Sequence, residues 1–304
     1  MRLMQRVLTY LPPKLLRKVF MSCNYDCEIS FLEGNMCKLI SSASANVKKI
    51  AWIHTDVVEM EKTGTGFINR EKERDCYNSF DRIVCVSNDA RKAFETKLQI
   101  YKKVFTIYNG VNKEEIIRLS NIGEKFLVNE SYFKVCGVGR LSKEKRFDRL
   151  INATVKLHNE GYNIFTYIIG EGRLHTSLQE LIDSSNAGNY VKLLGFHDNP
   201  YCLMSQADCY VCSSEIEGFS LTVAEALVLG IPVLATKCSG PCELLDNGKY
   251  GVLVENDVKS IYLGLKQNFF DLNKIDKYKD MSKERAEFFN MSKTLSALIQ
   301  LIND

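Results

Sequence analysis

Short apolar runs rich in β-branched residues alternate with longer helix-like segments along almost the whole chain from about residue 26. This alternation is typical of parallel strands joined by helices that cover the sheet. The strands are expected at 27–32, 49–54, 82–87, 104–109, 133–139, 164–170, 191–196, 209–213, 232–236 and 251–255. The sequence therefore predicts an α/β fold.

The expected strands fall into two groups. Four precede Gly110, and six follow a loose segment at 123–131. Six parallel strands make a complete doubly wound domain, whereas four make a small one. We therefore predict two Rossmann-like, doubly wound parallel-sheet domains. Their predicted limits are 1–118 for the first, 119–131 for a linker, 132–281 for the second, and 282–304 for a C-terminal helix that packs back on the first.

The charge and the cysteine content indicate which partners and which cellular compartment to expect. The 304 residues hold 40 Lys and Arg against 37 Asp and Glu, and a formal charge of +3 does not call for a nucleic-acid partner. The 11 cysteines are an odd number and are scattered, and the first residues do not resemble a cleavable signal peptide. This pattern favours a reducing compartment. We expect a cytoplasmic protein without nucleic-acid partners.

The first twenty residues, MRLMQRVLTYLPPKLLRKVF, are basic and apolar without a single acid. Their cations are Arg2, Arg6, Lys14, Arg17 and Lys18. Such a composition suits contact with a membrane surface, which would place the protein peripherally on the inner face of the membrane. The alternative interpretation is a solvated basic helix at a frayed terminus.

The stretch EIEGFSLTVAEALVLGIPVLAT at 215–236 predicts a tight turn at Gly218 and a helix at about 221–229 that Ser220 can cap. The helix is followed by Gly230 and Pro232, which favour its end. Its start offers unpaired backbone N–H groups and the positive end of the helix dipole, which together favour an anion. These amides belong to Phe219, Ser220 and Leu221.

Glu225 lies one turn inside this helix, and its neighbours in the other directions are almost all apolar. A helix that is apolar all round is usually buried, and a buried carboxylate is costly unless it is hydrogen-bonded. Sugar hydroxyls would serve as donors. A neighbouring backbone group or a lysine would serve equally well, so both interpretations stay open.

The segment GVGRLSKEKRFD at 137–148 is a glycine turn directly after an expected strand. It lacks a dinucleotide fingerprint because Ser142 stands where the third glycine is needed. Arg140 and Lys145 are placed to bind phosphate oxygens, although either could be an ordinary solvated charge. His54 ends another expected strand, where ligands gather in open α/β sheets, although a lone histidine is more often structural. We expect no metal site.

Together these segments resemble the GT-B glycosyltransferases, and specifically the large retaining family 4 that builds bacterial polysaccharides and glycolipids. The most specific mark is a pair of glutamates with seven residues between them, Glu217 and Glu225, in EGFSLTVAEAL. Four more segments follow the expected order: GRLSKEKRFDRLI, IIGEGRLHTSLQELI, LLGFHDNP and GIPVLATKCSGPCELL. The resemblance covers most of the chain and implies a GT-B fold.

The resemblance implies a donor site in the second domain. Glu225 would hydrogen-bond the ribose hydroxyls, Phe196 would border the base, and Gly139 would contact the donor. Arg140 and Lys145 would neutralise the departing diphosphate.

The resemblance also implies contacts to the transferred sugar. Amides from Gly218 to Leu221 would meet the phosphate and the sugar, and Glu217 would orient the hexose. His54 matches the histidine on the acceptor side.

The implied activity is the retaining, metal-independent transfer of a hexose from a nucleotide sugar, with UDP as the expected carrier. The acceptor would be a glycan or a lipid-linked molecule in cell-surface polysaccharide biosynthesis, and no cofactor is expected. One feature departs from the family. Its members normally begin with a strand, a glycine-rich loop and a helix, whereas only 26 residues precede CEISFLEG here.

This departure predicts an N-terminal domain that lacks its first part. The sequence could begin late, a separate partner chain could complete the domain, or the protein could have kept nucleotide binding without catalysis. The alternative function is therefore an inactive or split-enzyme subunit that binds a nucleotide sugar.

Overall fold

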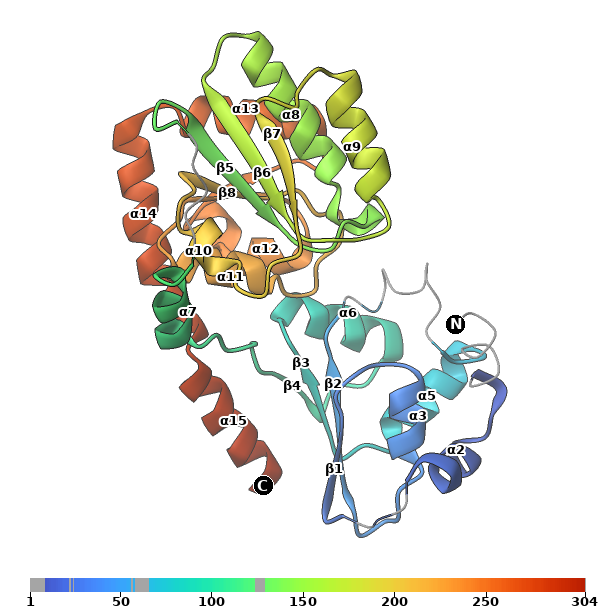
Figure 1. Cartoon of the computed structure of the whole chain (residues 1–304). Coiled ribbons are helices and arrows are strands. Elements are labelled where there is room, and N and C mark those ends of the chain that lie inside the picture. The colour runs from blue at the N-terminus through green and yellow to red at the C-terminus, as the bar shows by residue number, and fades with distance from the viewer. Residues whose placement is uncertain are drawn as a thin grey trace. The chain divides into compact units, whose positions relative to one another are not determined.

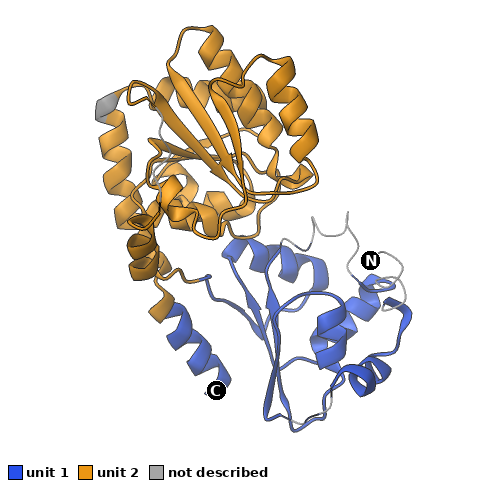
Figure 2. Cartoon of the chain, viewed as in Figure 1, with its two compact units in different colours: residues 1–109, 293–304 blue, residues 110–292 orange. Residues whose placement is uncertain are grey.

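The computed structural model describes residues 9–21, 23, 25–55, 57, 66–123 and 129–303, and contains two parallel sheets (Figure 1). The chain divides into two compact units, residues 1–109 with 293–304 and residues 110–292 (Figure 2). The predicted α/β class is confirmed, and each of the ten expected strands is present. Arg2, Arg6 and part of the predicted linker lie outside the described residues, and the predicted domain limits stay predictions.

The first unit contains a four-stranded parallel sheet in the order β1-β2-β3-β4. Its strands are Cys27–Ser30, Lys48–Ile53, Arg82–Cys85 and Val104–Thr106. Because each crossover steps in the same direction, right-handed connections place the linking helices on one face. These helices are α3 (Asn35–Ser41), α5 (Arg70–Asn78) and α6 (Asn88–Leu98).

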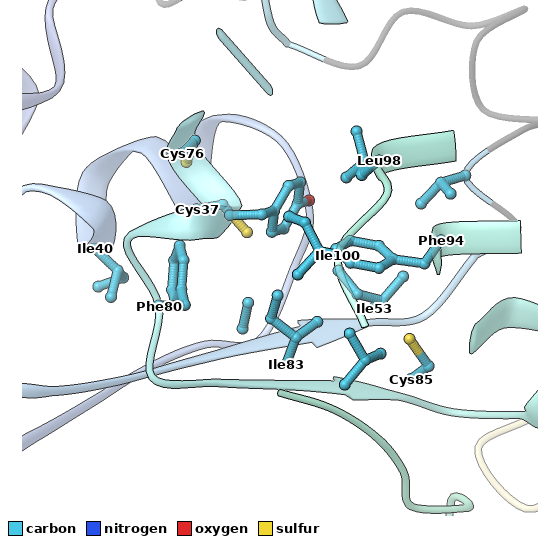
Figure 3. Packing of buried hydrophobic residues seen from close by; sticks show 14 of the residues in the cluster. Cys37, Ile40, Ile53, Cys76, Phe80, Ile83, Cys85, Phe94, Leu98 and Ile100 are labelled. Carbon is cyan, nitrogen blue, oxygen red and sulfur yellow. The ribbon is translucent and has the colours of Figure 1, made fainter. Parts of the chain in front are cut away.

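Buried side chains from α3, α5, α6 and the sheet form the core of this unit (Figure 3). The core includes the thiols of Cys37 and Cys76, and burial raises their pKa values to about 11 and about 12. Both thiols therefore stay protonated and pack as small apolar groups, as expected for free cysteines in a protein interior.

The second unit contains a six-stranded parallel sheet in the order β10-β9-β8-β5-β6-β7, which is the doubly wound Rossmann order. Its strands, in chain order, are Phe133–Val138, Ile164–Ile169, Val191–Gly195, Cys209–Cys212, Val233–Thr236 and Val252–Val254. The helices α8 (Phe147–Asn159), α9 (His175–Ser184) and α13 (Val258–Asn268) cover one face, and α11 (Leu221–Val228) and α14 (Leu272–Ala286) the other (Figure 1). The strand order reverses between β5 and β8, which defines the crevice where such sheets bind ligands.

The C-terminal segment differs from the single helix expected at 282–304. Helix α14 ends at Ala286, a short turn follows at Glu287–Phe289, and α15 begins at Met291. The break is fixed by tertiary contacts, because Phe289 is only 2% exposed and its carbonyl accepts the Val111 N–H at 2.8 Å.

The last turns of α15 (Met291–Asn303) belong to the first unit. There the Thr294 hydroxyl donates to the Tyr108 carbonyl at 2.9 Å, and the Lys48 ammonium donates to the Ile302 carbonyl at 2.7 Å. Among the described residues, we find no helix with the length and apolar character that a bilayer crossing needs.

Candidate functional site

The carboxyl ends of β5 and β8 carry the polar groups that the sequence singled out. Gly139 and Arg140 follow β5, and a short helical turn at Lys143–Lys145 comes next. The loop after β8 leads through Ser214 to Glu217. These two loops flank the point where the strand order reverses, so they border the crevice of the doubly wound sheet.

Lys145 and Glu217 form an ion pair across this crevice. Their side chains are 24% and 12% exposed, and the Ser214 hydroxyl donates a second hydrogen bond to Glu217 at 2.9 Å. Burial acts to lower the pKa of Lys145, but the charge of Glu217 raises it, and the net effect is a raised pKa. Lys145 is therefore a fixed cation that solvent still reaches, as required for binding a phosphate.

The turn that carries Glu217 and Gly218 is held by the start of α12 (Ser239–Leu244). The Gly240 N–H and the Ser239 hydroxyl donate to the Glu217 carbonyl at 2.8 and 3.0 Å. A Cβ at Gly240 would lie 3.0 Å from the Cα of Phe219, so the close approach requires glycine there. The Phe219 ring packs on Phe289 with centroids 5.7 Å apart, which anchors the turn in the core.

Helix α11 begins directly after this turn. Ser220 occupies the N-cap position, but its hydroxyl makes no capping bond and instead contacts the Thr222 hydroxyl at 3.3 Å. The predicted side-chain cap is therefore wrong. Because the N–H groups of Ser220 and Leu221 donate to none of the described residues, they remain available to an anion at the positive end of the helix dipole.

Glu225 is largely buried on α11, as its apolar neighbours predicted. The Tyr201 hydroxyl donates to its Oε1 at 2.9 Å. Burial raises the pKa of Glu225 to about 7, although the bond from Tyr201 opposes the increase. A tyrosine, rather than a backbone group or a lysine, is thus the hydrogen-bonding partner of this carboxylate, and its role toward a ribose stays a prediction.

An open pocket of about 350 Å³ lies beside the end of β5. It is lined by Val138, Gly139, Arg140, Ile169, Gly170, Glu171, Phe196, His197 and Pro200. The Phe196 ring is 65% exposed, so one aromatic face is available to a flat ligand. Arg140 is exposed and makes no ion pair with any described residue.

Two glycines allow the loops around this pocket to approach. A Cβ at Gly170 would lie 2.1 Å from the Gly139 carbonyl oxygen, and one at Gly172 would lie 2.4 Å from the Leu141 carbonyl oxygen. The Leu141 N–H donates to the Glu171 carbonyl at 2.9 Å, which holds the two loops together. The G-E-G sequence is thus explained by backbone packing.

His54 follows β2 in the first unit. Its ring stacks beside Trp52 and Phe31, with centroid separations of 6.4 and 5.1 Å. Burial lowers the pKa of His54, although the charge of Glu33 opposes this shift. The imidazole is therefore neutral at pH 7, and its buried Nε2 has no hydrogen-bonding partner.

Several residues of the site were not singled out from the sequence. Glu33 accepts the backbone N–H groups of His54 and Thr55 and so fixes the turn after β2. Its position just after the expected strand 27–32 was the signal that could have revealed it. Tyr201 had no comparable signal. Within the described ranges, no group of three or more His, Cys, Asp or Glu residues could hold a metal ion.

The structure thus gathers most of the predicted residues in one crevice of the second unit. Gly139, Arg140 and Phe196 line the pocket, and Lys145 lies against Gly139, where an added Cβ would be 3.1 Å from its Cε. Two family models match the chain. The one described as glycosyl transferases group 1 covers residues 120–286, and the one described as glycosyltransferase family 4 covers residues 5–115.

Curated relatives cover large parts of the chain. It is 31% identical over 249 residues to an uncharacterized glycosyltransferase of Methanocaldococcus jannaschii, covering 76% of this chain and 61% of the relative. It is 35% identical over 196 residues to the N-acetylgalactosamine-N,N'-diacetylbacillosaminyl-diphospho-undecaprenol 4-alpha-N-acetylgalactosaminyltransferase of Campylobacter jejuni, covering 63% and 51%. The chain therefore spans about half to three fifths of the length of these relatives.

Solved structures agree on the fold. Sucrose-phosphate synthase of Thermosynechococcus elongatus matches with a TM-score of 0.80 at 17% identity, covering 97% of this chain and 78% of that one. HepE of Anabaena, solved with UDP, matches with a TM-score of 0.77 at 19% identity, covering 95% and 81%. Such likeness supports the fold alone, and it confirms the predicted GT-B class.

Proposed function

The chain belongs to the glycosyl transferases group 1 family, and on that premise we propose that it transfers a hexose from a UDP-sugar to a glycan or a lipid-linked acceptor. The observation that carries this proposal is the ion pair of Lys145 and Glu217 at the switch point of the second sheet. A cation held beside two available helix amides suits a diphosphate, and the neighbouring carboxylate suits sugar hydroxyls.

The printed names of relatives support this choice of donor and acceptor. HepE of Anabaena was solved with UDP-glucose, and the Campylobacter jejuni relative is named as an N-acetylgalactosaminyltransferase acting on a diphospho-undecaprenol. A further relative, 28% identical over 169 residues, is an O-antigen biosynthesis glycosyltransferase of Escherichia coli. A role in cell-surface polysaccharide biosynthesis is part of the proposal.

In the proposed reaction, the bond between the anomeric carbon and the diphosphate breaks, and a bond from that carbon to an acceptor hydroxyl oxygen forms. UDP departs with the bonding electrons, and the hydroxyl proton leaves with it or goes to solvent. Lys145, Arg140 and the α11 amides stabilise the negative charge on the departing diphosphate, which makes the reaction metal-independent. The transfer retains the anomeric configuration, and no cofactor takes part.

The remaining residues bind substrates in this proposal. Phe196 borders the base, and Glu225 accepts hydrogen bonds from the ribose hydroxyls in place of, or beside, the bond from Tyr201. Glu217 orients the hexose while it remains close to Lys145. On the acceptor side, neutral His54 offers a hydrogen-bond acceptor once its Nε2 is uncovered.

The proposed acceptor also motivates a membrane contact through helix α2 (Pro13–Phe20). Leu15, Val19 and Phe20 are exposed beside the exposed Lys14 and Lys18, and the helix contains no acid. This combination of apolar and cationic side chains suits an anionic lipid surface. An open pocket of about 580 Å³ begins at the same helix and has a mostly apolar wall.

Acceptor-dependent release of UDP tests the transfer. The protein is incubated with a panel of UDP-hexoses and with lipid-linked or free glycan pools, and the anomeric configuration of any product is read by NMR. Release that needs both substrates, continues with chelator present and gives a retained product supports the proposal. Tight UDP binding without release for any pool would instead support the nucleotide-sugar-binding subunit.

Sedimentation with vesicles tests the membrane contact separately. The protein should sediment with vesicles of anionic phospholipid at low salt and less with zwitterionic ones, and the double variant Leu15→Ser with Val19→Ser should weaken the binding. Equal recovery with both lipid types would instead support the solvated basic helix.

A further inference from the structure

Arg146 directly follows Lys145 and has an unusual backbone conformation. Its φ is 49° and its ψ is 40°, in the left-handed region, at the junction between the turn Lys143–Lys145 and helix α8. A residue with a Cβ pays a conformational penalty there, whereas glycine does not. Such strain persists only where surrounding contacts enforce it, and it is common beside functional groups.

The contacts that hold Arg146 come from its guanidinium. It donates to both carboxylate oxygens of Asp148 at 3.0 Å each and to Glu215 at 3.1 Å. The hydrogen bonds to Asp148, followed by those to Glu215, raise the pKa of Arg146 against the opposing effect of burial. Glu215 lies in the loop after β8, two residues before Glu217, so one side chain bridges the two loops of the crevice.

Two further hydrogen bonds to backbone carbonyls join the same two loops. The Glu215 N–H donates to the Glu144 carbonyl at 2.7 Å, and the Ser213 hydroxyl donates to the Lys145 carbonyl at 2.8 Å. The segment just before Glu217 is thus tied to the segment that carries Lys145.

A third loop joins the same cluster. Asn256, which precedes α13, accepts a hydrogen bond from Arg149 and donates to the Glu215 carbonyl at 3.5 Å. Arg149 also lies 3.8 Å from the Glu215 carboxylate. Glu215 is therefore contacted from the loops that follow β5 and β10, at the same edge of the sheet.

We propose that the Arg146–Glu215 ion pair is a clamp that fixes Lys145 opposite Glu217 and thereby sets where the ammonium meets the donor diphosphate. This inference rests on the proposed glycosyl transfer. Arg146 and Glu215 act through Lys145 and are positioning residues. An ordinary exposed ion pair contributes little, but this one joins two loops of the crevice and coincides with a strained backbone beside the cation.

The variant Arg146→Gly separates this role from folding, because glycine adopts the left-handed conformation without strain while the guanidinium is lost. We expect kcat to fall about tenfold, since small displacements of a charged partner are costly in catalysis. The melting temperature should not fall, and the affinity for UDP should change less than kcat. Lys143→Ala removes an exposed cation of the same turn and should leave kcat unchanged.

Glu215→Gln should reproduce the loss of kcat, and the double variant should be no worse than the more severe single variant, because both remove one interaction. Independent, multiplying losses in the double variant would overturn the clamp. A melting temperature that falls in parallel with kcat for Arg146→Gly would also overturn it, because the effect would then be structural.

A second test of the clamp does not depend on catalytic activity. It measures by mass spectrometry the rate at which acetic anhydride acetylates the Lys145 ammonium. The clamp predicts that Arg146→Gly speeds acetylation of Lys145 severalfold and leaves Lys143 unchanged. If the wild-type protein transfers no sugar but shows this change, the proposed function fails and the clamp stands. If the wild type turns over and neither kcat nor acetylation responds to the variant, the clamp is wrong.

Discussion

The Lys145 ammonium and the Glu217 carboxylate face each other from loops that follow two different strands and form an ion pair at the edge of the second sheet. Neither group is fully buried, and Glu217 keeps a second donor in Ser214 at 2.9 Å. Removing Lys145 therefore does not strand an unpaired charge in the core. A substitution of Lys145 should therefore lower kcat much more than it lowers the melting temperature.

Lys145→Ala should lower kcat by on the order of 100-fold, because the proposed transfer uses its ammonium as a preorganised charge beside the departing diphosphate. The measurement is acceptor-dependent UDP release under saturating donor. The melting temperature should change little, since Glu217 retains its bond from Ser214 and contact with solvent.

Lys143→Ala is the matched control for this prediction, because Lys143 is an exposed cation in the same short turn. It should leave kcat within a factor of about two. Unchanged turnover in Lys145→Ala, or an equal loss in both variants, would remove Lys145 from the proposed mechanism.

The sequence was sufficient to predict the strands and the edge of the sheet at which the site forms. Strands buried on both faces are continuous apolar runs, and polar residues that follow such runs meet at one edge. Lys145 was singled out because it follows such a run, whereas Glu217 was singled out through the family resemblance. The sequence also shows glycines at 170 and 172. Only the structure shows why glycine is needed there, namely that each lies against the backbone of a neighbouring loop.

Contacts between distant segments could not be predicted. Tyr201 reaches Glu225 across 24 positions of sequence, and no local pattern indicates that bond. The break before α15 is similar, because it depends on the burial of Phe289 and the bond from Val111. The clamp depends on a backbone conformation of Arg146 that its residue type disfavours.

The free energy of unfolding should depend less on pH in Glu225→Gln than in the wild type. The pKa of Glu225 is raised from 4.5 to about 7 in the folded protein, so the folded state binds more protons between these values. Its contribution to stability is then fully present below pH 4.5 and is lost as the pH rises through about 7. The glutamine variant should be more stable than the wild type at pH 8 by up to about 3 kcal/mol.

Denaturant unfolding of both proteins between pH 5 and pH 8 measures this difference. Tyr201→Phe is a useful companion, because loss of the donated bond should raise the pKa of Glu225 further and steepen the loss of stability. A difference between the wild type and Glu225→Gln that stays constant with pH would contradict the burial of an ionisable carboxylate. UDP binding by Glu225→Gln should weaken if the carboxylate contacts the ribose.

The buried ion pair of Lys97 and Glu73 in the first unit offers a test of stability away from the site. Their side chains are 1% and 5% exposed, with 3.2 Å between Lys97 Nζ and Glu73 Oε2. Lys97→Met should cost about 3–5 kcal/mol, because it breaks this buried ion pair by removing one of its two charges.

The double variant Lys97→Met with Glu73→Leu is the control, because it removes both charges. It should recover most of the loss, since apolar replacements of a buried pair are often neutral. Urea unfolding measures the two single variants and the double variant. If the loss in the double variant equals the sum of the losses in Lys97→Met and Glu73→Leu, the two side chains are not coupled.

Gly170→Ala should destabilise the second unit and distort the pocket beside β5. Gly170 has a φ of +140°, and an added Cβ would lie 2.1 Å from the Gly139 carbonyl oxygen, so backbone rather than a flexible side chain must move. We expect a loss of at least about 2 kcal/mol in unfolding free energy, with weaker UDP binding at a temperature where the variant is folded. Gly188→Ala is the control, because a Cβ there meets nothing within 4 Å. Equal stability of the two variants would show that the loops at 139 and 170 do not need their close approach.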